Sequence, residues 1–195
     1  GGEGGGGEGE GSGAAEGSDV GLSLEKLALL LKHGALVDGM NGRGESALDV
    51  ALFHGGPEVV GALLRAGATS TMTTAHGGCL LHAAALARRA DVLEAALGVL
   101  RAIRVDLNQQ DASGCTPLHL AVACSEPSLV GPLLRAKAST EIQTDDGSTA
   151  LRLAVSQGDL PLSRALLAVG ADKDALGADG IPLLLLAGTS RSRCT

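Results

Sequence analysis

Cysteine and histidine are the residues of this sequence that could supply a nucleophile, a general base or a metal ligand. The four cysteines are Cys79, Cys115, Cys124 and Cys194, and the chain also has five histidines. No two cysteines form a CxxC pair, and no cysteine–histidine group has the spacing of a zinc site. A cysteine–histidine dyad is an alternative, but an internal repeat, described below, accounts for the same positions. We therefore expect no metal, no cofactor and no catalysis, and free thiols typical of a reducing compartment.

Two further patterns could bind ions. Aspartates gather toward the C-terminus, as Asp145 and Asp146 and as Asp172 and Asp174, but their spacing lacks the pattern of an EF-hand calcium loop. We expect a solvated acidic face there. Residues 1–17 are mostly glycine and glutamate, with neither the preceding strand nor the lysine of a phosphate-binding loop. A segment with so little to bury is expected to be disordered.

Charge and composition narrow the class of partner. The net charge is −7, and five acidic residues without any Lys or Arg lie in the first 20 positions, which leaves −2 for the rest. Without a basic stripe, we expect binding neither to nucleic acid nor to an anionic membrane surface. No apolar run approaches the roughly 18 residues of a membrane span, and no signal peptide is visible. We expect an intracellular protein, cytoplasmic or nuclear.

The apolar residues are unusual in kind. They make up 45% of the 195 residues, yet the chain has one Phe and no Trp or Tyr. A compact single core of this size normally uses several aromatic side chains to fill its interior. Thin layers of Leu, Ala and Val do not need them, so the composition favours a stacked array of small units.

Glycines mark a repeat along the chain. Gly44, Gly77, Gly114, Gly147 and Gly180 are separated by 33, 37, 33 and 33 residues. The clearest copy, residues 114–121, reads GCTPLHLA, and looser copies in the same register read SALD, CLLH, TALR and PLLL. A period of 33 with this motif resembles the ankyrin-repeat family and its G-x-T-P-L-H-x-A signature. The resemblance covers about residues 24–188.

The chemistry of the motif agrees with a helix pair. Thr116 is a good N-cap for the backbone N–H three residues on, and Pro117 suits the first helical position. A second helical pattern follows Pro127, with apolar residues on one face. Neither helix is long enough to be stable alone. Each pair must therefore bury its apolar face against the next pair.

The resemblance implies an all-α solenoid of stacked helix-turn-helix units with short, hairpin-like finger loops. We expect His82 and His119, at the motif's histidine position, to bond to neighbouring loop backbone. The expected organisation is a disordered tail (1–20), a repeat domain (21–188) and a polar tail (189–195). Within the domain we expect a partial repeat at 21–40, repeats at 41–73, 74–110, 111–143 and 144–176, and a partial repeat at 177–188.

Some copies depart from the pattern. The third copy is four residues longer, which predicts one extra turn on its outer helix, and it has Cys79 where a threonine would cap the helix. The fourth copy has Pro132 inside its outer helix. It also has Lys137 where three other copies have the glycine of a left-handed C-cap, namely Gly34, Gly67 and Gly170. At the ends, the pattern predicts an outer helix from Leu24 to Gly34 without a good inner partner. It also predicts an inner helix over Ile181 to Ala187 without an outer one, so we expect self-association through this open end.

The resemblance implies a protein–protein interaction scaffold that binds its partner through finger loops and the concave surface of the inner helices. The alternative is the recognition segment of a larger enzyme, channel or ubiquitin-ligase adaptor whose catalytic or pore part lies outside this chain. By register, the residues expected on the binding surface are Arg43, Glu45, Phe53, His54, His76, Leu86, Ala112, Ser113, Asp145, Asp146, Ser156 and Gln157.

Two of the candidate residues have competing interpretations. A lone aromatic such as Phe53 is usually a core residue, but Leu86, Ala123 and Ser156 at its register do not form a core column, and an exposed Phe would be a natural binding anchor. Asn108 stands in an L-x5-[DE]-apolar-N context that resembles ankyrin fingers hydroxylated by an asparaginyl hydroxylase. Asn also suits turn geometry for structural reasons alone.

Overall fold

The computed structural model describes residues 16–69, 78–103 and 106–189. This part of the chain contains ten α-helices, and its β-structure is limited to a single antiparallel bridge between Met40 and Ser46. The helices are α1 (Glu16–Lys32), α2 (Ala47–His54), α3 (Pro57–Arg65), α4 (Leu80–Leu86), α5 (Ala90–Ile103), α6 (Pro117–Ala123), α7 (Pro127–Arg135), α8 (Ala150–Gln157), α9 (Leu160–Ala168) and α10 (Leu183–Thr189).

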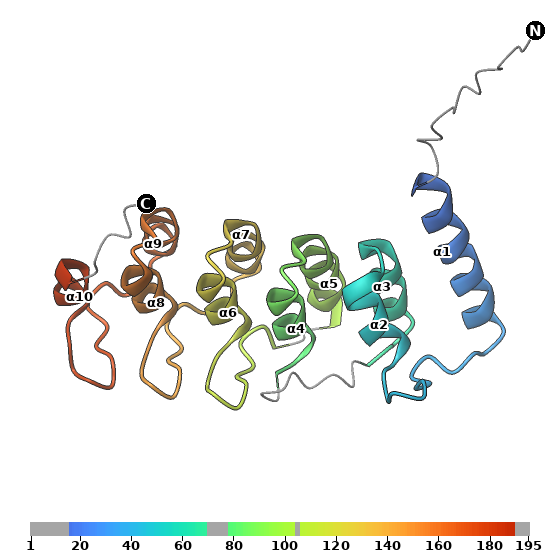
Figure 1. Ribbon diagram of the computed structural model, residues 1–195, viewed down its shortest axis with the longest axis horizontal. Helices are drawn as coiled ribbons and strands as arrows, with labels where there is room; N and C mark the ends of the chain where they lie inside the picture. Colours follow the sequence, from blue (N-terminus) through green and yellow to red (C-terminus); the bar gives the residue numbers. More distant parts are fainter. Residues whose placement is uncertain (1–15, 70–77, 104–105, 190–195) are drawn as a thin grey trace, which may run out of the picture.

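The helices form two rows (Figure 1). The inner row consists of α2, α4, α6, α8 and α10, and the outer row of α3, α5, α7 and α9, with α1 at the N-terminal end. Each inner helix from α2 to α8 packs against the outer helix that follows it in the chain, and α4, α6, α8 and α10 pack successively. The predicted all-α array of stacked helix pairs is confirmed.

Capping residues set where the inner helices begin. Thr116 caps α6, and its Oγ1 accepts a 3.4 Å hydrogen bond from the backbone N–H of His119. The side chains of Ser46 and Thr149 cap α2 and α8 in the same way. Pro117 occupies the first position of α6, where its missing N–H costs nothing. The capping predicted from the motif is therefore correct.

The core is a thin layer of aliphatic side chains between the two rows. The leucine at the second position of each inner helix from α2 to α8 is fully buried, as is a leucine from each of α7 and α9. These residues are Leu48, Leu81, Leu118, Leu151, Leu133 and Leu166. Phe53, in contrast, is 43% exposed. The interpretation of Phe53 as a core residue is wrong, because thin layers of Leu, Ala and Val fill the space between the rows.

Left-handed residues end the helices α1, α3, α7 and α9. Gly34, Gly67 and Gly170 have φ of 80°, 86° and 94°, and the next backbone N–H bonds back to the last helical turn. Lys137 takes the same conformation with φ of 68°. A side chain in this region costs about 1–2 kcal/mol, so the lysine cap is strained as the sequence predicted.

Two other departures have clear structural outcomes. The helix α5 has 14 residues, whereas α3, α7 and α9 have nine each, which confirms the extra turn in the third copy. Pro132 lies inside α7, yet this helix is as long as α3 and α9. The proline ring is buried, so packing holds the helix through the missing hydrogen bond.

Both ends of the array contain single helices. The helix α1 begins at Glu16, before the expected start at Leu24 and inside the range 1–20 expected as a tail, and it packs on the outer helix α3. The helix α10 packs on the inner helix α8. The predicted outer and inner half-pairs are thus present. Residues 1–15 and 190–195 lie outside the described residues, so the predicted disordered N-terminal tail and polar C-terminal tail remain predictions there.

Candidate partner-binding surface

The loops before α2, α6 and α8 are narrow fingers that project from the inner row (Figure 1). A backbone hydrogen bond closes each one: Asn41 N to Glu45 O (3.0 Å), Asp111 N to Cys115 O (2.8 Å) and Thr144 N to Ser148 O (3.0 Å). Gly44, Gly114 and Gly147 turn the chain just before these closures, each with a positive φ near 75°. The fingers are therefore the hairpin-like loops that the sequence predicted.

Side chains brace the fingers from within. Asn41 Oδ1 accepts the backbone N–H groups of Arg43 (2.8 Å) and Glu45 (3.1 Å). Asp111 Oδ1 accepts those of Ser113 and Cys115, both at 2.9 Å. Because these bonds hold the backbone of the tips, the finger backbone loses little freedom when a partner binds.

Most of the residues expected on the binding surface lie outside the core. Among those that the structure describes, Glu45 is half-buried and the others are exposed. His76 lies outside the described residues. Phe53 and its register equivalents Leu86, Ala123 and Ser156 are all exposed. This column of residues at the ends of the inner helices faces solvent, as the comparison of the copies suggested.

The structure divides part of the expected surface between two grooves. Ala112, Ser113, Asp145 and Asp146 line a groove of about 510 Å³, which also includes residues of α6 and α8. We call it the finger groove. Glu45 and His54 line a separate groove of about 790 Å³ at the N-terminal end, beside α2. We call it the α2 groove, and neither groove is lined by Phe53 or Leu86.

Gln157 is partly occupied in holding the array together. Its Nε2 donates to the carbonyl of Ala123 (3.3 Å), and its Oε1 accepts from the hydroxyl of Ser125 (3.4 Å), both in the preceding repeat. Ser156 donates its hydroxyl to the carbonyl of Leu153, within the same helix. Both side chains are exposed, so exposure alone does not distinguish residues that bond within the array from residues that bind a partner.

The acidic finger tip keeps its charge. Thr144 donates its hydroxyl to Asp146, and Ser148 donates both its backbone N–H (3.3 Å) and its hydroxyl (3.2 Å) to the same carboxylate. These bonds, that from Thr144 above all, lower the pKa of Asp146 despite some desolvation. Asp145, beside it, is exposed. The tip therefore places two aspartates in the lining of the finger groove.

His82 connects two repeats. Its Nδ1 accepts the backbone N–H of Cys79 (3.0 Å), and its Nε2 lies 2.9 Å from the carbonyl oxygen of Cys115 in the next finger. These partners assign the proton to Nε2 and leave Nδ1 as an acceptor. The Cys79 thiol, 3.1 Å from the same Nδ1, is then a donor. This is the structural role predicted for the motif histidine.

His119 has the same position one repeat later. Its Nδ1 accepts the backbone N–H of Thr116 at 3.1 Å, while its buried Nε2 has no hydrogen-bond partner among the described residues. Burial lowers the pKa of His119, so the neutral imidazole is the folded form. The Thr116 hydroxyl lies 2.8 Å from the same Nδ1, but its oxygen also accepts the backbone N–H of His119, so it serves as the helix cap.

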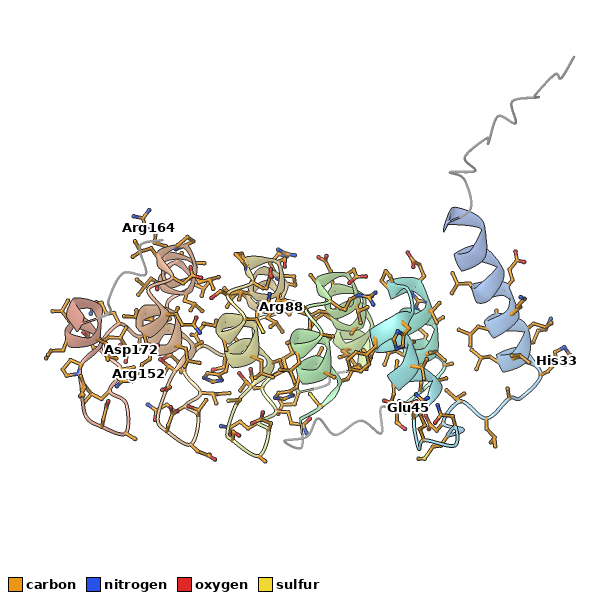
Figure 2. All side chains as sticks on the ribbon, in the orientation of Figure 1. His33, Glu45, Arg88, Arg152, Arg164 and Asp172 are labelled. Atoms are coloured by element: carbon orange, nitrogen blue, oxygen red, sulfur yellow. The ribbon has the colours of Figure 1, made fainter. Side chains whose placement is uncertain are left out.

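Arginines that the sequence left unassigned connect neighbouring repeats. Arg152 is buried and donates to the carbonyl of Ile181 (2.8 Å) and to the carboxylate of Asp179 (2.5 Å), in the loop before α10. Figure 2 shows Arg152 between α8 and that loop. A Cβ on Gly177 would lie 2.6 Å from the guanidinium, so the glycine makes room for it. In the sequence, the signal for this role of Arg152 was that it stands at the motif's histidine position.

Arg89 and Arg88 reach the C-terminal ends of inner helices. Arg89 donates to the carbonyls of Phe53 (3.2 Å) and Gly55 (2.9 Å), at the end of α2, and forms an ion pair with Asp91. Arg88 donates to the carbonyl of Cys124 at the end of α6 (3.2 Å). A cation at a helix C-terminus compensates unpaired carbonyls and the helix dipole. In the sequence, the one sign of this helix-end role was that the two arginines are adjacent.

Asn108 also makes a bond that recurs in the array. Its Oδ1 accepts the backbone N–H of Ser139, 31 residues on, at 2.8 Å. Asp38 does the same for Thr69 (2.8 Å), and Glu141 for Asp172 (3.2 Å). The recurrence supports a structural role for Asn108. Its hydroxylation remains a prediction.

The described residues offer little for catalysis. Cys79, Cys115 and Cys124 are free thiols, and Cys194 lies outside the described residues. In residues 16–69, 78–103 and 106–189, no three histidine, cysteine or acidic side chains come together as a metal site. Within the same ranges, no helix has the length and apolar character to cross a membrane.

Comparisons with known proteins agree with the geometry. A family model for ankyrin repeats, in three copies, matches residues 80–177. The nuclear factor NF-kappa-B p105 subunit of Gallus gallus is 37% identical over 73% of this chain, and the neurogenic locus notch homolog protein 2 of Homo sapiens is 30% identical over 74%. The E3 ubiquitin-protein ligase KEG of Arabidopsis thaliana is 35% identical over 51%.

These similarities involve short parts of long proteins. The matched segments make up 15% of the p105 subunit and 6% each of the notch homolog and the ligase. The chain belongs to the ankyrin-repeat family.

Proposed function

We propose that this chain is a protein-interaction scaffold that binds a partner protein at the finger groove. The observation that carries the proposal is the groove itself, about 510 Å³ in volume and lined by two consecutive fingers and two consecutive inner helices. Ankyrin repeats are generally interaction modules, and a braced concave surface is what such binding requires.

The side chains around the groove favour a partner of a particular chemistry. Asp145 and Asp146 stand at one edge, and Leu120 and Leu153 line the groove with them. An apolar side chain of the partner would enter between the leucines, while a Lys or Arg would meet the carboxylates. We therefore propose that the partner presents a basic residue next to an apolar one.

Phe53 and Leu86 provide a second contact region in this proposal. Both are large, apolar and exposed, and they stand at the same register of α2 and α4. Exposed apolar anchors contribute much of the binding energy in protein interfaces. Arg43 and Glu45, on the first finger, would supply polar contacts at the rim of this region.

The experiment is proximity labelling in cells, followed by direct binding measurements with the protein that it identifies. The variant Asp145→Arg should weaken binding at least tenfold, because it repels a basic side chain, and Phe53→Ala should weaken it by about 2 kcal/mol. Arg164→Glu, an exposed change on the outer helix α9, is the matched control and should leave affinity unchanged. Equal affinity of all variants would overturn the proposal.

One observation favours a second candidate function. The segment that this chain matches is 6–15% of the relatives described above, and one of these is a ubiquitin ligase by name. In the second proposal, the array is the recognition segment of a larger enzyme, channel or adaptor, and it recruits the substrate at the same groove. The full-length transcript distinguishes the two proposals directly. The free thiols favour an intracellular site of action in both.

A further inference from the structure

Each end of the described array contains half of a helix pair. At the N-terminal end, α1 packs on α3 as an outer helix does, and no inner helix precedes α2 among the described residues. At the C-terminal end, α10 packs on α8 as an inner helix does, and no outer helix follows it in the part of the chain that the structure describes. One end thus has an outer helix without its inner partner, and the other end has an inner helix without its outer partner.

The α2 groove is the place that a preceding inner helix would occupy. Ala47, Val50, Ala51 and His54 recur at helical spacing along α2 and line the groove of about 790 Å³, together with Met40. The helices α6 and α8 each pack against the inner helix that precedes them, and their first residues, Pro117 and Ala150, are buried. At the same position of α2, Ala47 is exposed, and Val50 is 41% exposed. The groove is therefore an inner-helix contact face without its neighbour.

The outer helix α1 lacks the same neighbour. Leu30 is at the register of Leu63 in α3 and of Leu133 in α7, each of which packs toward the inner row. Leu63 is 2% exposed, but Leu30 is 58% exposed. An inner helix placed in the α2 groove, in register with the array, would cover this leucine as well.

At the other end, α10 has an uncovered face of matching character. Leu184 is 86% exposed, although Leu118 and Leu151 at its register are fully buried. Leu185 is exposed too, at the position where His82 and Arg152 reach the next repeat. The apolar face of α10 therefore points to where the next inner helix and an outer partner would lie.

We propose that copies of this chain associate head to tail, with α10 of one copy in the α2 groove of the next. Across the junction, α10 of the first copy and α1 of the second form one helix pair, and α10 continues the inner row into α2. Such a contact joins two different surfaces, so it produces chains or closed rings rather than a symmetric dimer.

Charge and composition favour a second copy as the occupant of the groove. Residues 183–189 have no charged side chain, so α10 can enter an apolar groove without burying a charge. The last six residues contain two arginines and no acid, whereas the first 20 contain five acids and no base. The two end segments of the sequence therefore have opposite charge, which favours contact between opposite ends of two copies. Residues 1–15, a competing occupant, consist of Gly, Glu, Ser and Ala and have no large apolar side chain.

The test blocks each end separately. The variant Leu184→Glu with Leu185→Glu blocks the α10 face, and Val50→Glu blocks the α2 groove; the three leucine and valine side chains are exposed, so folding should survive. By sedimentation velocity from low to high micromolar concentration, the wild type should exceed its monomer mass of 19.3 kDa. Each blocked variant alone should stay monomeric. An equal mixture of the two should form a dimer, because one free end of each kind remains.

The controls separate this contact from other kinds of association. Leu160→Glu changes an exposed leucine of α9 and should leave association unchanged. A monomeric wild type at high micromolar concentration would overturn the proposal. So would a Val50→Glu variant that dimerises alone, since two α10 faces would then be pairing. A wild-type monomer that associates once residues 1–15 are removed would show that this chain's own N-terminal segment occupies the groove.

Discussion

The first helix pair, α2 and α3, and the pairs built on α6 and α8 have the same local design but different surroundings. Each inner helix has a capping Ser or Thr, and each has a fully buried leucine at its second position. Yet the face of α2 toward the N-terminus is open, while α6 lies between α4 and α8. Local sequence thus determines that a helix forms, and its neighbours determine how much of it is buried.

The residue at the motif's histidine position also differs between the copies. Arg152 in α8 and His82 in α4 bond to backbone carbonyls of the following repeat. Asp49, at the same position of α2, accepts the backbone N–H (2.8 Å) and hydroxyl (2.7 Å) of Ser46, its own capping residue. Arg89 of the third copy also joins that copy to the first pair. Because the α2 groove leaves one face of the first pair uncovered, we expect the two regions to differ in stability.

The largest expected effect comes from truncating the buried leucines. Leu118→Ala should lower the free energy of unfolding by about 2–5 kcal/mol, because it opens a cavity between packed neighbours. Leu48→Ala removes the same group from the end of the array. Hydrogen exchange should then rise in α4 to α9 for the first variant and only in α1 to α3 for the second. Equal loss of protection in α8 and α9 for both variants would contradict the difference between the regions.

A smaller effect is expected for the connection at the end of α2. Arg89→Ala removes the two bonds to the carbonyls of Phe53 and Gly55 and should cost about 1–2 kcal/mol, with the loss of protection centred on α2 and α3. Arg164→Ala is the control, because this arginine is exposed on α9, away from the end of α2; substitutions of exposed surface residues usually change stability by less than about 0.5 kcal/mol. Equal urea midpoints for the two variants would show that Arg89 does not hold the first pair.

The third effect concerns strain at a helix end. Lys137→Gly should stabilise the array by about 1 kcal/mol, since glycine adopts a positive φ without a Cβ penalty. Gly67→Ala, at the equivalent position after α3, should cost a similar amount. Urea unfolding of both variants measures this, and a Lys137→Gly protein less stable than wild type would mean that the lysine side chain has a role beyond the turn.

Much of the fold could be predicted because the repeat fixes local chemistry at each register. The threonine caps, the glycine C-caps and the extra turn in α5 follow from residue types and spacing alone. The start of α1 at Glu16 could not be predicted, since residues 1–20 are rich in glycine, which weakens helical propensity.

The binding surface was harder to predict. The position of a residue in the repeat indicates whether it is exposed, but not which exposed residues lie together in one groove. Ala112, Ser113, Asp145 and Asp146 do line one groove. Gln157 bonds to the preceding repeat, which depends on side-chain reach and not on spacing. The α2 groove results from a neighbour that the described residues do not provide, and no local motif carries that information.

The smallest effect expected is a pH dependence that comes from the repeats of α4 and α6, where the motif position holds a histidine rather than the Asp49 of α2. Burial lowers the pKa of His119 below its unfolded value of about 6.5. The stability that neutral His119 contributes is therefore present above that value and is lost as pH falls through it toward the folded pKa. His119→Gln removes the titrating group, so its loss of stability between pH 7.5 and pH 5, measured by urea unfolding, should be smaller than in wild type.

His82 is the matched control for this experiment. Burial opposes its charged form, but a charged ring can pair with the Cys79 side chain, whose own pKa is lowered, and still donates from Nε2 to the Cys115 carbonyl, so the pKa of His82 is raised. A raised pKa contributes stability at low pH that is lost as pH rises. Replacing His82 by Gln should therefore make the loss between pH 7.5 and pH 5 larger, opposite to His119→Gln. If both variants change the pH dependence in the same direction, the two histidines share one environment and the assigned difference is wrong.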